Sequence, residues 1–238
     1  MDELYGGGAI WHGGRDKQAI ALTFDDCYDY ELLCGLENIL DQNPEVHITF
    51  FPTGIALLNT FSKCQQLWQR FLAKGHEIGY HGYDHAMPSN LGYQQTVADF
   101  DNWNMALSMV MSREVSIRFA RPPYGDLSQN FLRVCRERNI IPVMWSANWS
   151  TSHKTNYKEV EEVQNGDIVI FHIRHQDIES FENILPILQK KAMRAVGLSE
   201  LLFGQDETVT SEIPRPASEA QQKSLCAYPG SRRDVCIK

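Results

Sequence analysis

The sequence has no pair of cysteines at the close spacing that cysteine-based zinc sites use. Its 238 residues include six cysteines, and no two of them are separated by only two residues. This disfavours a zinc site built from cysteines. Cys226 and Cys236 flank a Tyr-Pro-Gly turn and could close a small disulfide loop. For the other four cysteines, buried free thiols and disulfides are equally open interpretations, so the cellular compartment is only weakly indicated. These four are Cys27, Cys34, Cys64 and Cys135.

Positive charge is also scarce. The chain has 22 Lys and Arg against 30 Asp and Glu, which gives a formal net charge of −8 at pH 7. Because there is no basic surplus to release counterions, nucleic acid is not expected as the main partner, and a neutral or cationic ligand is favoured.

Long apolar runs are missing as well. No stretch approaches the roughly 18 consecutive apolar residues that a membrane span needs, so we expect no transmembrane segment. The first residues lack a basic segment followed by an apolar one, so no signal peptide is predicted. Residues 1–8 are Gly-rich and unlike the rest, which leaves open an artificial or processed end and a signal peptide that has been removed.

Short buried strands alternate with helical segments along the chain, and 43% hydrophobic residues suffice for a sizeable core. Such alternation predicts a parallel sheet with helices outside, either doubly wound or closed into a barrel. Because about seven strands end in polar residues, a single-domain α/β barrel over residues 18–203 is favoured, with a lead-in at 1–17 and a polar tail at 204–238. Strands are expected at 19–24, 46–51, 76–80, 115–120, 140–146 and 167–172, and helices at 30–40, 62–73, 91–111, 131–138, 157–163 and 178–195.

Two adjacent carboxylates, Asp25 and Asp26, end the first buried strand. They repel each other, and this is tolerable if one binds a cation while the other transfers protons. A helix cap in a solvated turn is an equally weighted alternative.

Two histidines, His81 and His85, follow the third predicted strand. Two imidazoles and one carboxylate leave an open position for water, as in catalytic rather than structural zinc sites. A divalent ion there would acidify that water and polarise a carbonyl. Two unrelated loop histidines are the alternative, and Glu77 and Asp84 are nearby candidates to support the site.

Three further residues suit hydrolytic chemistry. Arg121 precedes a rigid Pro-Pro turn and could clamp Asp25, while the backbone N–H of Tyr124 could donate to a developing oxyanion. His172 ends an apolar strand and could protonate a leaving amine. An ordinary turn and a satisfied core histidine are the corresponding alternatives.

In order, these motifs resemble those of the polysaccharide deacetylase family, carbohydrate esterase family 4. The resemblance covers about residues 18–203 and extends to the closing Gly-Leu-Ser-Glu-Leu-Leu segment at 197–202. It implies a distorted (β/α) TIM-like barrel that removes N-acetyl groups from chitin, chitooligosaccharides or peptidoglycan, or O-acetyl groups from xylan. It also implies an extracellular or cell-surface protein, expected here as a monomer, acting on acetylated polysaccharide.

The resemblance assigns a role to each motif residue. Asp25 is then the general base, His172 the general acid, Arg121 the residue that orients the base, and Tyr124 the oxyanion donor. The metal set is Asp26, His81 and His85, holding a divalent ion, most often zinc, with cobalt or another ion possible, whose water is the nucleophile. Pro123 and Ile170 would contact substrate, and Trp145 and Trp149 would stack on a sugar or pack in the core.

The sequence departs from the family pattern at three places. Cys27-Tyr28-Asp29 stands where Gly-Pro is usual, Gly82 stands where Ser or Thr is usual, and Asn148 replaces an aspartate that orients the acid histidine. Asn148 can accept a hydrogen bond but supplies no charge. The expected function is therefore a metal-dependent N-deacetylase whose activity could be lowered; a carbohydrate-binding domain without turnover and an O-acetyl esterase are the alternatives. The glycosylation sequon that begins at Asn148 is interpreted as chance.

Overall fold

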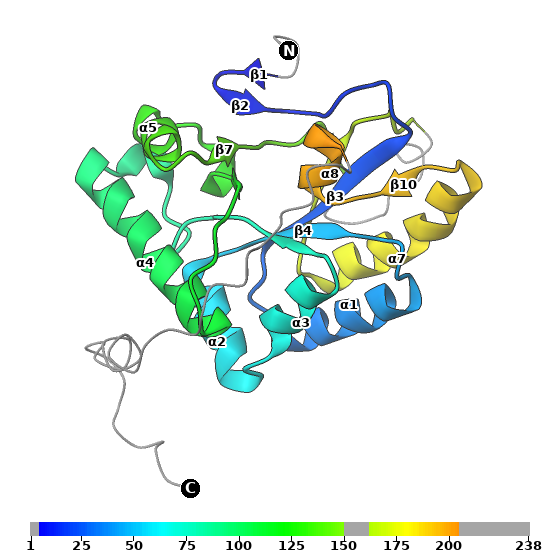
Figure 1. Cartoon of the computed structure of the whole chain (residues 1–238), viewed down its shortest axis with the longest axis horizontal. Coiled ribbons are helices and arrows are strands. Elements are labelled where there is room, and N and C mark those ends of the chain that lie inside the picture. Colours follow the sequence, from blue (N-terminus) through cyan, green and yellow to red (C-terminus); the bar gives the residue numbers. More distant parts are fainter. Residues whose placement is uncertain (1–4, 150–161, 205–238) are drawn as a thin grey trace, which may run out of the picture.

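The first long strand, β3 (Ala19–Asp26), lies at the centre of a parallel sheet in the computed structural model, which describes residues 5–149 and 162–204. It pairs with β4 (Ile48–Pro52) on one side (Figure 1) and with β9 (Ile168–His172) on the other. These strands consist of apolar residues with little alternation, as expected where both faces of a sheet are buried.

Shorter strands extend the sheet on both sides. β5 (Glu77–Ile78) pairs with β4, and β8 (Ala147–Asn148) pairs with β9. A parallel bridge between Tyr80 and Ala120 then leads to β6 (Phe119–Ala120), which pairs with β7 (Ile141–Pro142). The order β8-β9-β3-β4-β5-β6-β7 confirms the predicted barrel of about seven parallel strands. No ladder joins β7 to β8 within the described ranges, so the barrel is distorted there.

Residues of β3 alternate between two sides. Ile20, Leu22 and Phe24 pack in the larger core cluster beneath the helices, whereas Ala19 and Ala21 pack in a smaller cluster inside the barrel. Because side chains in a strand alternate with a period of two, the inner row continues with residues 23 and 25. Asp25 therefore reaches the mouth of the barrel from its interior side.

Seven α-helices surround the sheet in the described part of the chain, and three of them begin at a side-chain cap, which is Ser128 for α5. Asp29 accepts from Leu32 N at the start of α1, and Thr53 accepts from Ala56 N at the start of α2. The helices are α1 (Tyr30–Gln42), α2 (Gly54–Lys63), α3 (Leu67–Ala73), α4 (Tyr93–Met111), α5 (Gln129–Glu137), α7 (His175–Lys190) and α8 (Leu198–Phe203).

Two predicted helices are wrong in their extent. The segment expected as one helix at 62–73 contains the end of α2 and then α3, because Cys64 leaves the helical conformation and separates them. The helix expected at 178–195 is α7, which ends at Lys190, and Arg194–Ala195 form the short strand β10 instead. The helix expected at 157–163 lies almost wholly outside the described residues, as do Cys226 and Cys236. The remaining four cysteines are free thiols.

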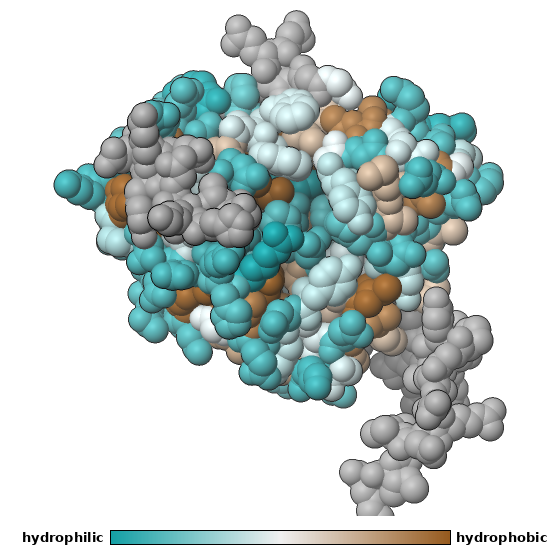
Figure 2. Space-filling model, turned by 180° about the vertical axis from the view of Figure 1, so that it is seen from behind, coloured by the Kyte–Doolittle hydropathy of each residue, from teal (hydrophilic) through white to brown (hydrophobic). Residues whose placement is uncertain are grey.

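The N-terminal lead-in packs on the barrel. Its strands β1 (Tyr5–Gly6) and β2 (Ala9–Ile10) form an antiparallel hairpin. Ile10 bridges Val143 in parallel and accepts a hydrogen bond from Met144 N at 2.7 Å. β10 (Arg194–Ala195) pairs with the beginning of β3. None of the described helices is long and apolar enough to cross a membrane, and the face seen in Figure 2 is mainly hydrophilic with scattered apolar patches.

Candidate active site

A break in the strand pleat brings Asp25 and Asp26 to the same site. In a regular strand, adjacent side chains point to opposite faces. Here Asp26 has a φ of 67° and Cys27 a φ of 64°, so the chain turns at once. Asp29, not either carboxylate, caps the following helix, so the helix-cap interpretation of the pair is wrong. Positive φ in residues other than glycine is costly and is typical of functional sites.

Cys27, the first departure from the family pattern, is a buried thiol directly behind the pair. Burial, followed by the charges of Asp26 and Asp25, raises its pKa well above the ordinary value. A buried neutral thiol is inert. Cys27 therefore acts as a small apolar residue of the core and not as a nucleophile.

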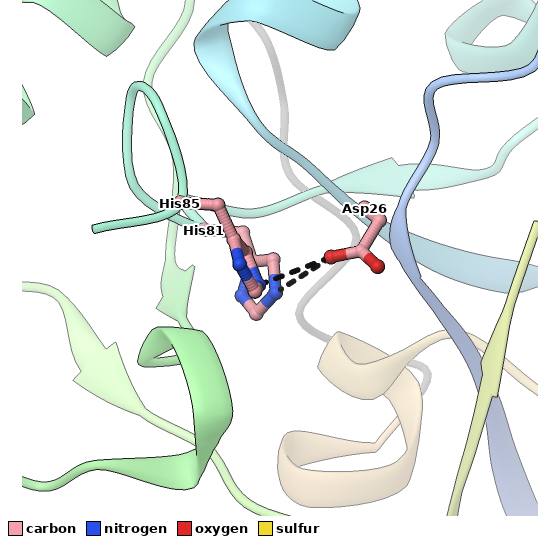
Figure 3. Close-up of side chains that lie close together, drawn as sticks. All are labelled: Asp26, His81 and His85. Atoms are coloured by element: carbon pink, nitrogen blue, oxygen red, sulfur yellow. Dashed lines mark ion pairs between the residues drawn. The ribbon is translucent and has the colours of Figure 1, made fainter. Parts of the chain in front are cut away.

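Asp26, His81 and His85 bring three potential ligand atoms together. Asp26 Oδ1 lies 3.1 Å from His85 Nε2 and 3.5 Å from His81 Nε2, with both rings directed at the carboxylate (Figure 3). Ligand atoms of a tetrahedral zinc ion, at about 2.0–2.2 Å from the metal, lie about 3.3 Å apart. The two observed separations bracket that value, so the donor set fits a small divalent cation.

The electrostatic surroundings of Asp26 and His81 also suit a cation. Asp26 Oδ1 is buried, and no imidazole N–H is aligned to donate to it despite the short contact. Burial alone would raise the pKa of Asp26, but the two histidines outweigh it and lower the pKa far below its ordinary value. Burial likewise acts to lower the pKa of His81, whereas Asp25 and Asp26 raise it overall. The pocket is therefore electronegative.

The orientation of His81 is set by a backbone carbonyl. Its Nδ1 lies 2.8 Å from Arg121 O. A carbonyl can only accept, so Nδ1 carries a hydrogen, and in the neutral ring the lone pair of Nε2 points toward Asp26. Glu77 and Asp84, the supports expected from the sequence, bond elsewhere: Glu77 accepts from Thr49 Oγ1, and Asp84 accepts from Ala86 N. That expectation is wrong for both.

The loop that carries the two histidines is held by the start of α2. Gly54 N donates to Gly82 O at 3.0 Å, and Ile55 N donates to Tyr83 O at 2.9 Å. These are first-turn N–H groups that have no partner within their own helix. The corner between β4 and α2 also holds Asp26, since Thr53 N donates to its carbonyl. One structural element thus positions both parts of the candidate metal set.

Gly82, the second departure, has a physical reason. Its φ is 76°, and a Cβ at this position would lie 3.0 Å from Pro123 Cγ. A serine or threonine would be strained in this conformation. Support comes instead from Asp99 in α4, whose two carboxylate oxygens accept from Tyr83 N at 3.0 and 3.1 Å. Asp99 also accepts from the Tyr80 hydroxyl, and burial raises its pKa.

Arg121 is fully buried inside the barrel and contacts Asp25 as expected. Its Nη1 donates to Asp25 Oδ1 at 2.7 Å and to Thr23 Oγ1 at 2.7 Å. Its other nitrogens donate to the carbonyls of Val143 and Met144. Burial lowers the pKa of the guanidinium, but the ordinary value is so high that it stays charged. Asp25 Oδ1 is thus occupied, while Oδ2 lies 3.8 Å from His81 Nε2.

The turn after Arg121 borders the histidines from the other side. Tyr124 lies in the 3-10 turn η3 (Pro123–Gly125) with a φ of 59°. The centroid of its ring lies 4.4 Å from the centroid of the His85 ring. The Tyr124 side chain is 64% exposed, and no acceptor among the described residues takes its N–H. Pro123 is buried against the loop at Gly82. A hydrogen-bond donor is therefore available at the mouth.

The two tryptophans differ in position. Trp145 is partly buried, with its ring 5.9 Å from the guanidinium of Arg121 and adjacent to Gly125. Trp149 is 1% exposed and packs edge-on against Phe171 in the main core. The prediction that Trp149 stacks on a sugar is wrong, because substrate cannot reach its ring; the core alternative is confirmed.

His172 lies opposite Asp25 in the register of β3 and β9. Its side chain is partly exposed, so it is not a core histidine. Ile170 is buried and occupies the same side of β9 two residues earlier. The backbone N–H of His172 donates to Asp177 Oδ2 at 2.7 Å, and the same oxygen lies 3.6 Å from His172 Nδ1. Asn148, the third departure, is exposed on the neighbouring strand β8.

Two residues that touch this site were not predicted, namely Asp99 and Asp177. Asp177 lies in the first turn of α7, where acidic residues are common at any helix start. Asp99 lies mid-helix, sixteen residues beyond the backbone group that it binds. Neither position has a pattern that separates it from an ordinary helix residue.

The fold and site define a parallel (β/α) barrel with a candidate metal triad beside a clamped carboxylate and a histidine. Residues 12–142 match the model of the polysaccharide deacetylase family, and the chain belongs to that family. A peptidoglycan-N-acetylglucosamine deacetylase of Bacillus cereus is 27% identical over 208 residues, covering 82% of this chain and 93% of the relative.

Solved structures of family members share this fold. A peptidoglycan N-acetylglucosamine deacetylase superposes with a TM-score of 0.71 at 24% identity, covering 81% of this chain and 91% of that one. A Bacillus anthracis protein described as a pseudoenzyme of carbohydrate esterase family 4 superposes with a TM-score of 0.71 at 18% identity, covering 85% and 71%. A mutant of that protein with restored enzymatic activity superposes with a TM-score of 0.70.

Proposed function

We propose that this protein is a metal-dependent hydrolase that removes N-acetyl groups from N-acetylglucosamine-containing polysaccharide or oligosaccharide of the peptidoglycan or chitin type. The observation that carries the proposal is the position of Asp25, whose Oδ1 is held by Arg121 while Oδ2 faces the cluster of Asp26, His81 and His85. Similarity to a peptidoglycan deacetylase and to a chitooligosaccharide deacetylase supports the substrate class.

Asp26, His81 and His85 would hold a divalent ion, and their mixed nitrogen and oxygen donors favour zinc. Such an ion, when bound, acidifies a water molecule and polarises the acetyl carbonyl. The remaining chemistry belongs to the chain's own residues.

Asp25 is the proposed general base. Its Oδ2 accepts a proton from the attacking water, while Arg121 holds the carboxylate in place through Oδ1. The Tyr124 N–H donates to the carbonyl oxygen as negative charge develops there. The water oxygen bonds to the carbonyl carbon, the C–N bond breaks, and His172 delivers a proton to the departing amine. Ile170, Pro123 and Trp145 are proposed to border the acetyl group and the sugar.

The proposal is tested by acetate release from N-acetylglucosamine oligomers and from peptidoglycan, with and without a chelator. We expect release that stops with chelator, returns with zinc, and falls by at least about a hundredfold in Asp25→Asn, because general base catalysis contributes about 10²–10⁴-fold. Asp29→Asn, which weakens only the cap of α1, is the matched control and should retain most activity. Chelator-insensitive release, or an active Asp25→Asn variant, contradicts the mechanism.

Two alternatives have specific support. A carbohydrate-binding domain without turnover is favoured by Asn148 and by the likeness to a pseudoenzyme; oligosaccharide binding without acetate release would establish it. An O-acetyl esterase shares the same site chemistry, and faster release from acetylxylan than from chitin oligomers would establish that activity.

A further inference from the structure

A buried carboxylate lies directly against the histidine proposed as the acid. Asp177 is 2% exposed, and its Oδ2 accepts from the backbone N–H of His172 at 2.7 Å. The same oxygen lies 3.6 Å from His172 Nδ1, which is an ion-pair distance and too long for a hydrogen bond. Asp177 therefore both holds the strand end that carries His172 and places negative charge beside its ring.

The position of Asp177 in the chain makes this contact rigid. It is the third residue of α7, and Arg174, which precedes the helix, accepts a hydrogen bond from Asp177 N at 3.1 Å. α7 is anchored by apolar side chains in the main core, among them Ile178 and Phe181. The backbone that carries the Asp177 carboxylate is therefore held in place beside His172.

We propose that Asp177 is the positioning residue for His172 and supplies the negative charge that Asn148 lacks; this rests on the proposed function. A carboxylate next to Nδ1 favours a hydrogen on that nitrogen and leaves Nε2 directed toward the substrate. In the step itself, the Nε2 proton passes to the amine nitrogen as the C–N bond breaks. The ring becomes neutral and keeps its Nδ1 proton toward Asp177, and solvent restores the proton at Nε2.

A purely structural role is the competing interpretation, since Asp177 also completes a hydrogen bond at a helix start. The two roles differ in their dependence on the leaving group. An amine must be protonated as it leaves, whereas a 4-nitrophenolate leaves without a proton. Loss of the acid's partner should therefore slow amide hydrolysis and spare hydrolysis of 4-nitrophenyl acetate at the same site.

The test compares the zinc-loaded wild type with Asp177→Asn on chitotetraose and on 4-nitrophenyl acetate. We expect kcat on chitotetraose to fall about tenfold to a hundredfold and the aryl ester rate to change less than about twofold. Asp167→Asn is the matched control, because Asp167 is also buried and precedes the same strand, but pairs with Arg15 at the opposite end. Equal losses on both substrates, or no loss on the amide, would overturn the proposal.

A readout without turnover separates this inference from the proposed function. Long-range ¹H–¹⁵N NMR spectra, assigned with His172→Gln, report which ring nitrogen of neutral His172 carries the hydrogen. We expect the Nδ1–H form to dominate in the wild type and to lose that dominance in Asp177→Ala, even if no acetate is released. A tautomer balance that is the same in both proteins would overturn the proposal. A wild type that shows this balance but releases no acetate would contradict the proposed function alone.

Discussion

Removal of Arg121 should cost far more stability than removal of one partner of an ion pair at the protein surface. The guanidinium is 0% exposed and Asp25 is 2% exposed, and their contact is 2.7 Å. In Arg121→Met the carboxylate stays buried without its partner. Breaking a buried pair in this way typically destabilises by about 3–5 kcal/mol, which is a large part of a domain's total of about 5–15 kcal/mol.

A double-mutant cycle isolates the pair. In Asp25→Asn/Arg121→Met no unpaired charge remains, so this double variant should be more stable than Arg121→Met alone, although it carries one more substitution. Urea unfolding of metal-stripped protein is the suitable assay, because bound metal would add its own stabilisation. With a slope of about 2 kcal/mol/M, the Arg121→Met midpoint should drop by roughly 1.5–2.5 M.

Two results would refute this reasoning. A loss below about 1 kcal/mol in Arg121→Met would mean that the guanidinium contributes no more than an exposed ion pair. If the stability changes of the two single variants add up to that of the double variant, Asp25 does not depend on Arg121. A matched surface pair, Arg138 with Asp101, provides the comparison, since both side chains are largely exposed at a similar distance of 2.7 Å.

Three further predictions concern other parts of the molecule. Asp99→Asn should weaken zinc binding about tenfold to a hundredfold in a competition titration, because Asp99 accepts a hydrogen bond from Tyr83 N, which lies between the two histidines. Asp101→Asn on the same helix is the control and should leave zinc affinity unchanged. An unchanged zinc affinity in Asp99→Asn would contradict the prediction. Burial lowers the pKa of His76 to about 4, so the unfolded chain binds a proton at this residue at a higher pH than the folded chain does. The free energy of unfolding should therefore be about 2 kcal/mol lower at pH 5 than at pH 7.5, and this difference should disappear in His76→Phe. The same difference in that variant would contradict the prediction. Asn148→Asp should raise the rate on chitotetraose less than about threefold if Asp177 already supplies the charge, whereas a gain of tenfold or more would show that it does not.

The parts of the site that the sequence predicts are those at strand ends. In a parallel barrel the carboxyl ends of all strands meet at one rim, so Asp25, Asp26, His81 and His172 can be grouped without knowledge of their distances. Arg121 belongs to this group because a Pro-Pro turn must leave the sheet directly after it. The contact of Arg121 with Asp25 was predicted for this reason and is present in the structure.

The supporting residues escape prediction because their role depends on how helices are placed against the rim. Asp99 and Asp177 are acidic residues on helices, where exposure is the usual outcome, yet both are turned toward backbone N–H groups of the site. Trp145 and Trp149 belong to the same short motif, and only the packing of Trp149 against Phe171 separates the core residue from the site residue. Such distinctions require the docking of one element on another, which a local pattern does not contain.

The departures from the family pattern are best understood through these supporting contacts. Gly82 cannot carry a hydroxyl in its conformation, and Asp99 binds the same loop from α4. Asn148 supplies no charge, and Asp177 places a buried carboxylate beside the same histidine from α7. In both cases the departure lies within a motif, and the carboxylate proposed to compensate for it lies on a helix outside the motif. Judged by its motifs alone, this chain looks impaired; its helices nevertheless place one buried carboxylate against the histidine loop and another beside His172, which is the support that the proposed deacetylase chemistry would use.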